Sequence, residues 1–208
     1  MKYPEFFTLV PGITLRDPLA DFLGAFEGGL VEYTYLDAVK LAGHSCPTVA
    51  SAYWLTQRSL RALYGPETPE RGAIRVEFRE DRLVGVVGVI ATVVSLLTGA
   101  AGDMGFKGIG GRFGRRQLLQ FSTDVPLEMR FTRTDTGAQV DALANLSAVS
   151  GDPAMPALLQ RCLHGQASAA EARQFAELWQ DRVRRILLEH GEDDGVFQIR
   201  RVASPAAR

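Results

Sequence analysis

The spacing of apolar residues predicts two helices in the middle of the chain. The first runs from about Pro47 to Tyr64. Residues of one helical face recur there at alternating intervals of four and three residues: Val49, Tyr53, Thr56, Leu60 and Leu63. The second covers about residues 86–98, inside nineteen residues, 84–102, that carry no charge. Glycine, serine and threonine interrupt this stretch, and a membrane helix needs about 20 mainly apolar residues. We therefore expect a buried core helix and not a membrane span.

Capping residues predict two further helices, one near each end of the chain. Asp17 precedes Pro18, which suits a first helical turn, and Gly28-Gly29 ends this short helix. Ser168 and Glu171 have the spacing of a capping box. The helix that they open carries an apolar stripe: Phe175, Leu178, Trp179, Val183, Ile186 and Leu187.

Alternating apolar and polar positions predict strands on both sides of the second helix. Residues 74–78 alternate strictly, and three candidate strands follow the helix, at 117–122, 127–134 and 138–143. Asp135-Thr136-Gly137 suits a hairpin turn between the last two. A final strand is expected at 196–202. The order helix, strand, helix and three strands indicates an α+β fold with a mixed sheet.

The chain divides at Gly151-Asp152-Pro153, after which its character changes. We expect residues 1–150 to form an α+β core domain with an N-terminal extension. Residues 151–208 are expected to be a C-terminal helical appendage packed on that core.

Composition narrows the classes of protein. Lys+Arg number 23 and Asp+Glu number 24, and a chain without a basic excess is not typical of a general nucleic-acid binder or a membrane-surface protein. Two cysteines exclude a disulfide scaffold and a four-cysteine zinc ribbon. The first residues show no secretory signal. We expect a cytoplasmic protein with neither a nucleic-acid nor a membrane partner.

One candidate site is the box Gly43-His44-Ser45-Cys46-Pro47. Pro47 suits the first turn of a helix, which places Cys46 at its cap, where the partial positive charge stabilises a thiolate. An imidazole and a thiolate two residues apart suit zinc, which needs four ligands or three plus water. The same residues also suit two other interpretations, a buried cysteine beside a structural histidine, or a nucleophilic Cys46 with His44 as its base.

Several groups are candidates for the remaining metal ligands. Cys162 and His164 are the only other Cys/His pair, but positions two apart on a helix point to opposite sides. Water, a carboxylate such as Asp37 or Asp103, and groups of a second protomer are the alternatives.

The second candidate site is the loop from Gly105 to Arg116, which packs five glycines and four cations into twelve residues. Glycines allow a close approach of the backbone, and Lys and Arg add charge, so the loop suits an anionic ligand. It has neither a Walker A sequence nor a dinucleotide-binding fingerprint. The candidate ligand-binding residues are Lys107, Gly108, Gly110, Gly111 and Arg112. The alternative is a surface turn whose cations pair with acidic residues elsewhere.

These motifs together resemble the FmdE family, which takes its name from a component of formylmethanofuran dehydrogenase. The resemblance covers about residues 30–145 and rests on Gly-His-Ser-Cys-Pro opening a helix, a strand, an apolar helix ending in Leu97-Thr98-Gly99, and the glycine loop. It implies an α+β core, a homodimer, and His44 and Cys46 as a metal or active site. The chain departs from the family pattern at Thr48, where glycine is usual, and lacks the four-cysteine zinc finger of many members.

The sequence thus favours an FmdE-like metal-binding protein that forms a homodimer. A divalent metal, zinc in this hypothesis, is held by His44 and Cys46, next to a cationic glycine loop that binds a small anionic ligand. The alternative is a non-catalytic binding module for an anionic metabolite or a redox partner protein. Whether the protein turns over any substrate is left open.

Overall fold

A computed structural model describes residues 2–203. Its five-stranded sheet has the order β4-β3-β5-β6-β7 and is mixed, because only the β3–β4 pair is parallel. Its strands are β3 (Ile74–Phe78), β4 (Leu119–Gln120), β5 (Met129–Arg133), β6 (Gln139–Ala144) and β7 (Phe197–Val202). The α+β fold expected from the sequence is confirmed.

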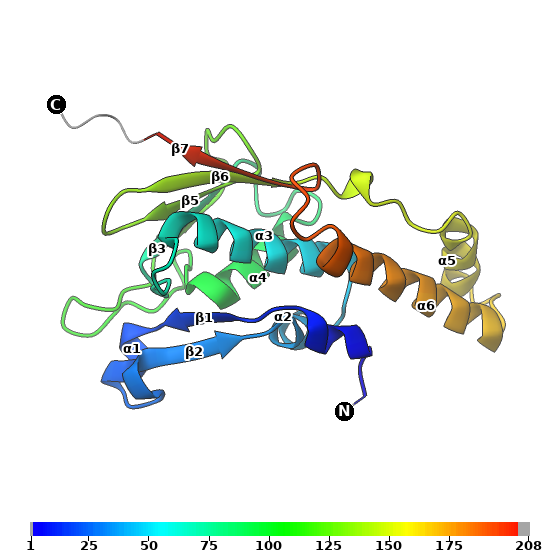
Figure 1. Ribbon diagram of the computed structural model, residues 1–208, viewed down its shortest axis with the longest axis horizontal. Helices are drawn as coiled ribbons and strands as arrows, with labels where there is room; N and C mark the ends of the chain where they lie inside the picture. The colour runs from blue at the N-terminus through cyan, green and yellow to red at the C-terminus, as the bar shows by residue number, and fades with distance from the viewer. Residues whose placement is uncertain (1, 204–208) are drawn as a thin grey trace.

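The elements form three layers, visible in Figure 1. Below the sheet lie α3 (Pro47–Tyr64) and α4 (Val87–Thr98). Below these helices lies a hairpin of β1 (Ile13–Arg16) and β2 (Leu30–Tyr33), together with α1 (Pro18–Phe22) and α2 (Tyr35–Ala42). The helix layer is therefore enclosed on two sides.

The position of α3 in the middle layer explains why most of this helix is buried. Thirteen of its eighteen residues are buried, although its apolar spacing marks only one face. The sheet covers one side, and the N-terminal segment covers another, where Tyr53 Oη and Gln57 Nε2 donate to the Pro11 carbonyl at 2.8 and 2.9 Å. Buried hydroxyls such as Thr56 donate to carbonyls of the helix itself (2.7 Å), and this pairing offsets the cost of burying them.

The predicted middle elements agree closely with the structure, and the N-terminal ones agree less well. The helix from Pro47 to Tyr64, the strand from 74 to 78 and the hairpin turn at Gly137 (φ 72°) are confirmed. The first helix ends at Phe22 and not near Gly28. The expected strand at 117–122 shrinks to the two residues of β4. Neither β1 nor α2 was predicted.

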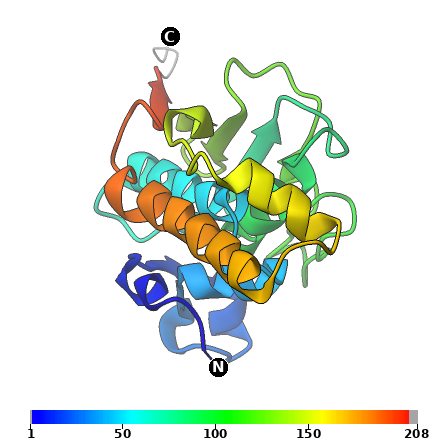
Figure 2. The same ribbon diagram turned by 90° about the vertical axis from the view of Figure 1, so that its right-hand side faces the viewer.

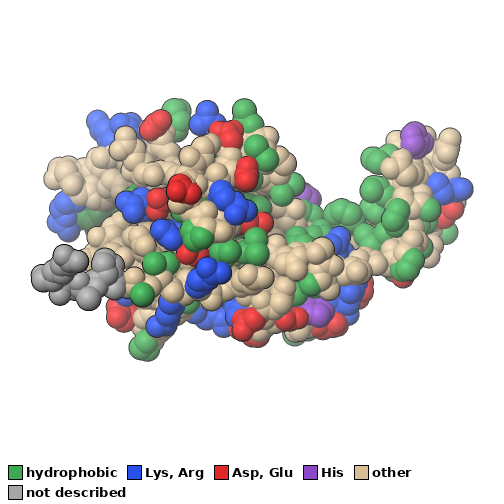
Figure 3. All heavy atoms as spheres, turned by 90° about the horizontal axis from the view of Figure 1, so that it is seen from above, with side chains coloured by type: hydrophobic (Ala, Val, Ile, Leu, Met, Phe, Trp, Pro, Cys, Tyr) green, Lys and Arg blue, Asp and Glu red, His purple; other side chains and the backbone are tan. Residues whose placement is uncertain are grey.

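The C-terminal segment is more than a helical appendage. It contains α5 (Met155–Leu163), α6 (Ala169–Arg184), one turn of π-helix (Arg185–Glu189) and β7, which pairs with β6 along its length. Figure 2 shows α6 lying alongside the body of the molecule. Figure 3 shows the α5 end projecting as an arm, with hydrophobic side chains in the hollow between arm and body. The expected capping box of Ser168 and Glu171 is confirmed.

None of the helices formed by residues 2–203 is both long enough and apolar enough to cross a membrane.

Candidate functional site

The His44/Cys46 box lies where α3 begins. Cys46 is the N-cap residue, as expected, and its Sγ accepts a hydrogen bond from the Val49 amide at 3.4 Å. The Cys46 side chain is buried. His44 is exposed, and its Nδ1 lies 2.9 Å from the Ala42 carbonyl oxygen. Cys46 thus has a structural role as a helix cap, whatever else it does.

Ser45, between these two residues, is fixed by the C-terminal helix. Its carbonyl accepts hydrogen bonds from Trp179 Nε1 and Gln180 Nε2, both at 3.1 Å. Its hydroxyl donates to Gln180 Oε1 and lies 2.9 Å from Tyr35 Oη. No motif in the sequence predicts these hydrogen bonds between Ser45 and α6, because Ser45 and Gln180 lie 135 residues apart. The box is consequently held by α6 as well as by its own helix.

The residues around the box do not complete a metal site within one chain. Between residues 2 and 203, no three or more His, Cys, Asp or Glu side chains are grouped so that they could hold a metal ion. Asp37 is engaged in the capping box of α2, where its Oδ2 accepts from the Thr34 amide and hydroxyl at 2.8 Å. Two ligands, His44 and Cys46, do not close the tetrahedral set that zinc requires. A metal there needs further ligands from water or a second chain, and the site stays a prediction.

The glycines of the cationic loop serve a tight turn. Ile109 and Arg112 exchange backbone hydrogen bonds at 2.9 and 3.0 Å, and Gly110 and Gly111 between them have φ angles of 56° and 78°. Two central residues with positive φ are typical of a type I′ hairpin. A Cβ at Gly108 would come within 2.3 Å of the Arg112 carbonyl oxygen. The turn therefore accounts for all three glycines that the sequence marked as ligand-binding.

The loop lies beside α1, at the far end of the helix layer from the box. Phe113 packs against Phe22 of α1 with ring centroids 5.2 Å apart, and Arg112 lies over the Phe113 ring at 4.7 Å. Lys107 is exposed. In Figure 1 the loop projects at the left, whereas α3 begins on the right, near α6. The structure does not bring the loop and the His44/Cys46 box together.

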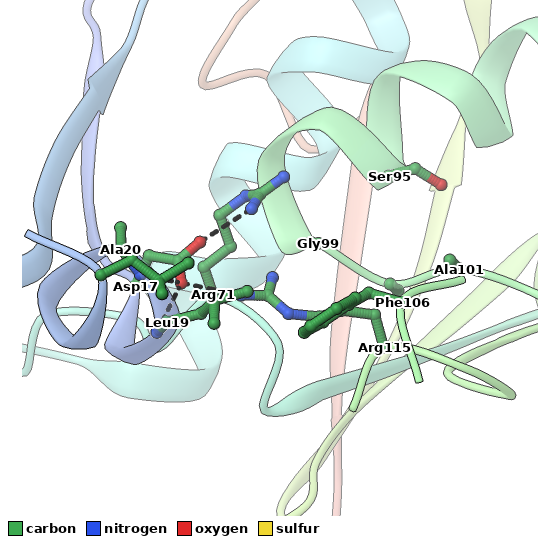
Figure 4. A pocket seen from close by; sticks show the side chains of 11 residues that line it. Asp17, Leu19, Ala20, Arg71, Ser95, Gly99, Ala101, Phe106 and Arg115 are labelled. Carbon is green, nitrogen blue, oxygen red and sulfur yellow. Dashed lines mark hydrogen bonds and ion pairs between the residues drawn. The ribbon is translucent and has the colours of Figure 1, made fainter. Parts of the chain in front are cut away.

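A charged cleft lies at the base of this loop, and we call it the arginine cleft. It has a volume of about 470 Å³, and Figure 4 shows Arg71 and Arg115 converging in it on Asp17. Arg71 Nη1 donates to Asp17 Oδ2 at 2.8 Å, and Arg115 Nη2 donates to Asp17 Oδ1 at 2.7 Å. The full lining is Asp17, Leu19, Ala20, Leu23, Arg71, Ser95, Gly99, Ala100, Ala101, Phe106 and Arg115.

Asp17 has two roles in the cleft. As predicted, it caps α1, because its Oδ1 accepts from the amides of Leu19 (3.0 Å) and Ala20 (3.2 Å). Burial alone would raise the pKa of the Asp17 carboxyl, but hydrogen bonding to Arg71 and the charge of Arg115 hold that pKa below its usual range. The carboxylate is therefore ionised at neutral pH.

Arg115 is the more deeply buried of the two arginines. Only 7% of its surface is exposed, and its Nε finds no hydrogen-bond acceptor anywhere in the described part of the chain. Burial lowers the pKa of the guanidinium, and the charge of Asp17 partly offsets this effect. Arg115 therefore lacks one hydrogen-bond partner within the described protein, and an unpaired buried donor costs about 1–3 kcal/mol.

Two glycines allow Arg115 to lie this deep. A Cβ at Gly99, the residue that ends α4, would lie 2.0 Å from Arg115 Nη1. A Cβ at Gly72 would lie 2.7 Å from Arg115 Nε. Arg71 is positioned by the same helix end, since its Nε donates to the Leu96 carbonyl at 3.2 Å. The negative end of the α4 dipole thus stabilises the cations.

A second cleft, of about 360 Å³, is lined by the same two arginines. Arg112 lines it, together with Glu70 and Phe113. Of the five loop residues that the sequence marked, only Arg112 lines either cleft. The sequence did place Arg115 among the loop cations, whereas Arg71 stands in no motif and was not expected in a site.

Neither protein-family models nor curated protein sequences give a match to this chain. The resemblance to the FmdE family therefore rests on the quoted residues alone and stays a prediction.

Proposed function

We propose that the protein is a binding module for a small anionic molecule, which it holds in the arginine cleft. This proposal takes up the alternative that the sequence left open, a binding module for an anionic metabolite. It moves the site from the tip of the glycine loop to the base of that loop.

The observation that carries the proposal is the imbalance of charge around Asp17. Two guanidinium groups share one carboxylate, so the cleft keeps one net positive charge in a largely buried place. Charges without a partner are costly to bury. An anion in the cleft would offset this cost, and guanidinium groups bind carboxylates and phosphates in a planar, two-pronged geometry.

The cleft is also organised before any ligand arrives. The Arg115 backbone is fixed on both sides, because its amide donates to the Phe106 carbonyl at 2.8 Å and its own carbonyl accepts from the Ala101 amide at 3.0 Å. The Asp17 carboxylate orients both guanidinium groups. A site whose donors are already ordered loses less conformational entropy on binding.

The predicted zinc site has no part in this binding. The cleft that Ser45 lines shares no residue with the arginine cleft, so a metal at the box and the loop would not act on one ligand. The zinc ion and the homodimer are separate expectations with their own tests.

Calorimetric titration of the whole protein with sodium acetate and with inorganic phosphate, at constant ionic strength, tests the proposal. Arg115→Lys keeps the charge but removes the planar fork, and we expect it to weaken binding about tenfold or more, because a charge-assisted hydrogen bond contributes about 1.5–3 kcal/mol.

The matched control is Arg130→Lys, which alters a comparable pair on the sheet, where Arg130 Nε donates to Asp141 at 2.7 Å. This variant should bind as the wild type does. If neither anion binds, or if both variants bind like the wild type, the proposal is wrong.

A further inference from the structure

The mouth of the arginine cleft is apolar and exposed. Leu23 and Phe106 line the cleft, and yet 61% and 41% of their surfaces are exposed. They come from two segments, since Leu23 is the C-cap residue of α1 and Phe106 is the second residue of the cationic loop. The contact between the rings of Phe22 and Phe113 joins the same two segments. We call Leu19, Leu23 and Phe106 the apolar rim.

Other exposed apolar residues lie close in sequence to the rim residues. Phe26 follows α1 and is 49% exposed, Met104 directly precedes the loop and is 98% exposed, and Ile109 on the loop is 43% exposed. Single exposed apolar residues are ordinary, but the apolar rim gathers three apolar side chains from two segments around one cleft, which is typical of a binding surface.

Building on the proposed anion site, we infer that its ligand is an amphipathic monocarboxylate, with its carboxylate at Arg71 and Arg115 and an alkyl or aryl chain on the apolar rim. The charge selects a monoanion, because the cleft carries one net positive charge and a doubly charged phosphate would leave one negative charge unmatched. Figure 4 shows both Phe106 and Arg115 at the arginine cleft, and the Phe106 carbonyl accepts from the Arg115 amide at 2.8 Å, so the apolar ring and the guanidinium come from adjacent stretches of backbone.

The size of the cleft fits this class of ligand. A volume of about 470 Å³ lies within the range of about 300–1,000 Å³ typical of small-molecule sites. Such sites are mostly apolar with a few placed polar groups, and apolar side chains make up much of this lining. A medium-length acyl chain or a single aromatic ring is therefore the expected apolar part.

A titration series tests the length of the apolar part. The whole protein is titrated with acetate, hexanoate and octanoate, and with inorganic phosphate, at constant ionic strength. Each methylene that the rim buries should tighten binding, by up to about fourfold where burial is complete. Octanoate should therefore bind at least tenfold more tightly than acetate, and phosphate should bind more weakly than octanoate.

A pair of surface variants tests the rim itself. Leu23→Asn should abolish most of the gain in affinity from acetate to octanoate. The matched control is Leu163→Asn at the end of α5, where the leucine is 70% exposed and lines no part of the arginine cleft. The control should keep the whole gain.

The outcomes separate this inference from the proposed function. Equal affinities for acetate and octanoate, both lost in Arg115→Lys, would overturn the inference and leave the anion site standing. The same holds if phosphate binds most tightly. Sedimentation of the wild type and Leu23→Asn tests a further alternative. If the wild type is a dimer and Leu23→Asn is a monomer, a second copy of the chain covers the apolar rim, and the inference is overturned. Absence of binding by any of these anions would overturn both proposals.

Discussion

Replacing Gly99 by alanine tests whether Arg115 is held as deeply as the cleft requires. The backbone of Gly99 has φ 71° and ψ 2°, a left-handed conformation in which alanine costs about 1–2 kcal/mol. The new methyl group would also lie 2.0 Å from Arg115 Nη1 and 3.0 Å from Arg71 Cγ. Arg115 must then move away from Asp17, and breaking a buried ion pair costs about 3–5 kcal/mol.

Gly43 provides a closely matched control. It ends α2 with φ 75° and ψ 0°, and nothing lies within 4 Å of a Cβ built there. Gly43→Ala should therefore lose only the conformational part, about 1–2 kcal/mol. The difference between the two variants is the cost of displacing Arg115, about 3 kcal/mol or more.

Urea unfolding followed by the fluorescence of Trp54 and Trp179 measures this difference. In thermal unfolding of a chain of this size, the same difference of about 3 kcal/mol corresponds to a difference in Tm of about 6–12 °C. Acetate binding should also weaken in Gly99→Ala and persist in Gly43→Ala. Equal losses of stability, with unchanged binding, would refute the close packing of Gly99 against Arg115.

Three other variants test Asp17 as the counter-ion of the arginines, the hydrogen bonds of Gln180 to Ser45, and the predicted zinc site. Asp17→Asn should lower the free energy of unfolding by about 3–5 kcal/mol at neutral pH, because the buried Arg115 and the partly buried Arg71 lose their counter-charge. Because folding lowers the pKa of Asp17, the contribution of this carboxylate to stability is complete above the ordinary value of 3.8 and is lost as the pH falls below it. The free energies of unfolding of the wild type and Asp17→Asn should therefore converge in acid. A difference that stays constant with pH would contradict the role of Asp17 as counter-ion. Gln180→Ala removes both hydrogen bonds of Gln180 to Ser45 and should lower the free energy of unfolding in urea by about 1–3 kcal/mol. The affinity for acetate should not change; a change would show that the His44/Cys46 box and the arginine cleft are coupled. The predicted zinc site requires a metal that elemental analysis finds in the wild type and not in Cys46→Ala, and metal absent from both, or equal in both, would refute it.

The parts of the fold that depend on local chemistry could be predicted from the sequence. Helix α3 could be placed because Pro47 and Gly65 mark its ends, and β3 because its alternation is strict. The helix α2 was missed although Thr34 and Asp37 have capping-box spacing and Tyr35 and Ala38 share a buried face, because its eight residues make only a short amphipathic pattern. The strand β4 is short because the chain turns through positive φ at Gln117 and Ser122 on either side of it, which a period of two does not reveal.

The candidate site could be predicted only in part for a related reason. A cluster of glycines and cations in the sequence marked the right loop, but the turn takes up the glycines, and the buried cation is Arg115. Asp17 was identified as a helix cap and not as a counter-ion, since its partners are 54 and 98 residues away. Ion pairs between such distant residues depend on the tertiary fold and leave no periodic signal.

The most direct test of the anion site is an NMR titration of the backbone amides of the whole protein with octanoate. The amides of Ala20, Gly99 and Phe106 surround the arginine cleft, and we predict that their resonances shift together and saturate, while those of His44 and Ser45 stay in place. Shifts confined to the His44–Ser45 region, or no saturable shift at the cleft, would contradict the assignment of an anion-binding site to Arg71 and Arg115.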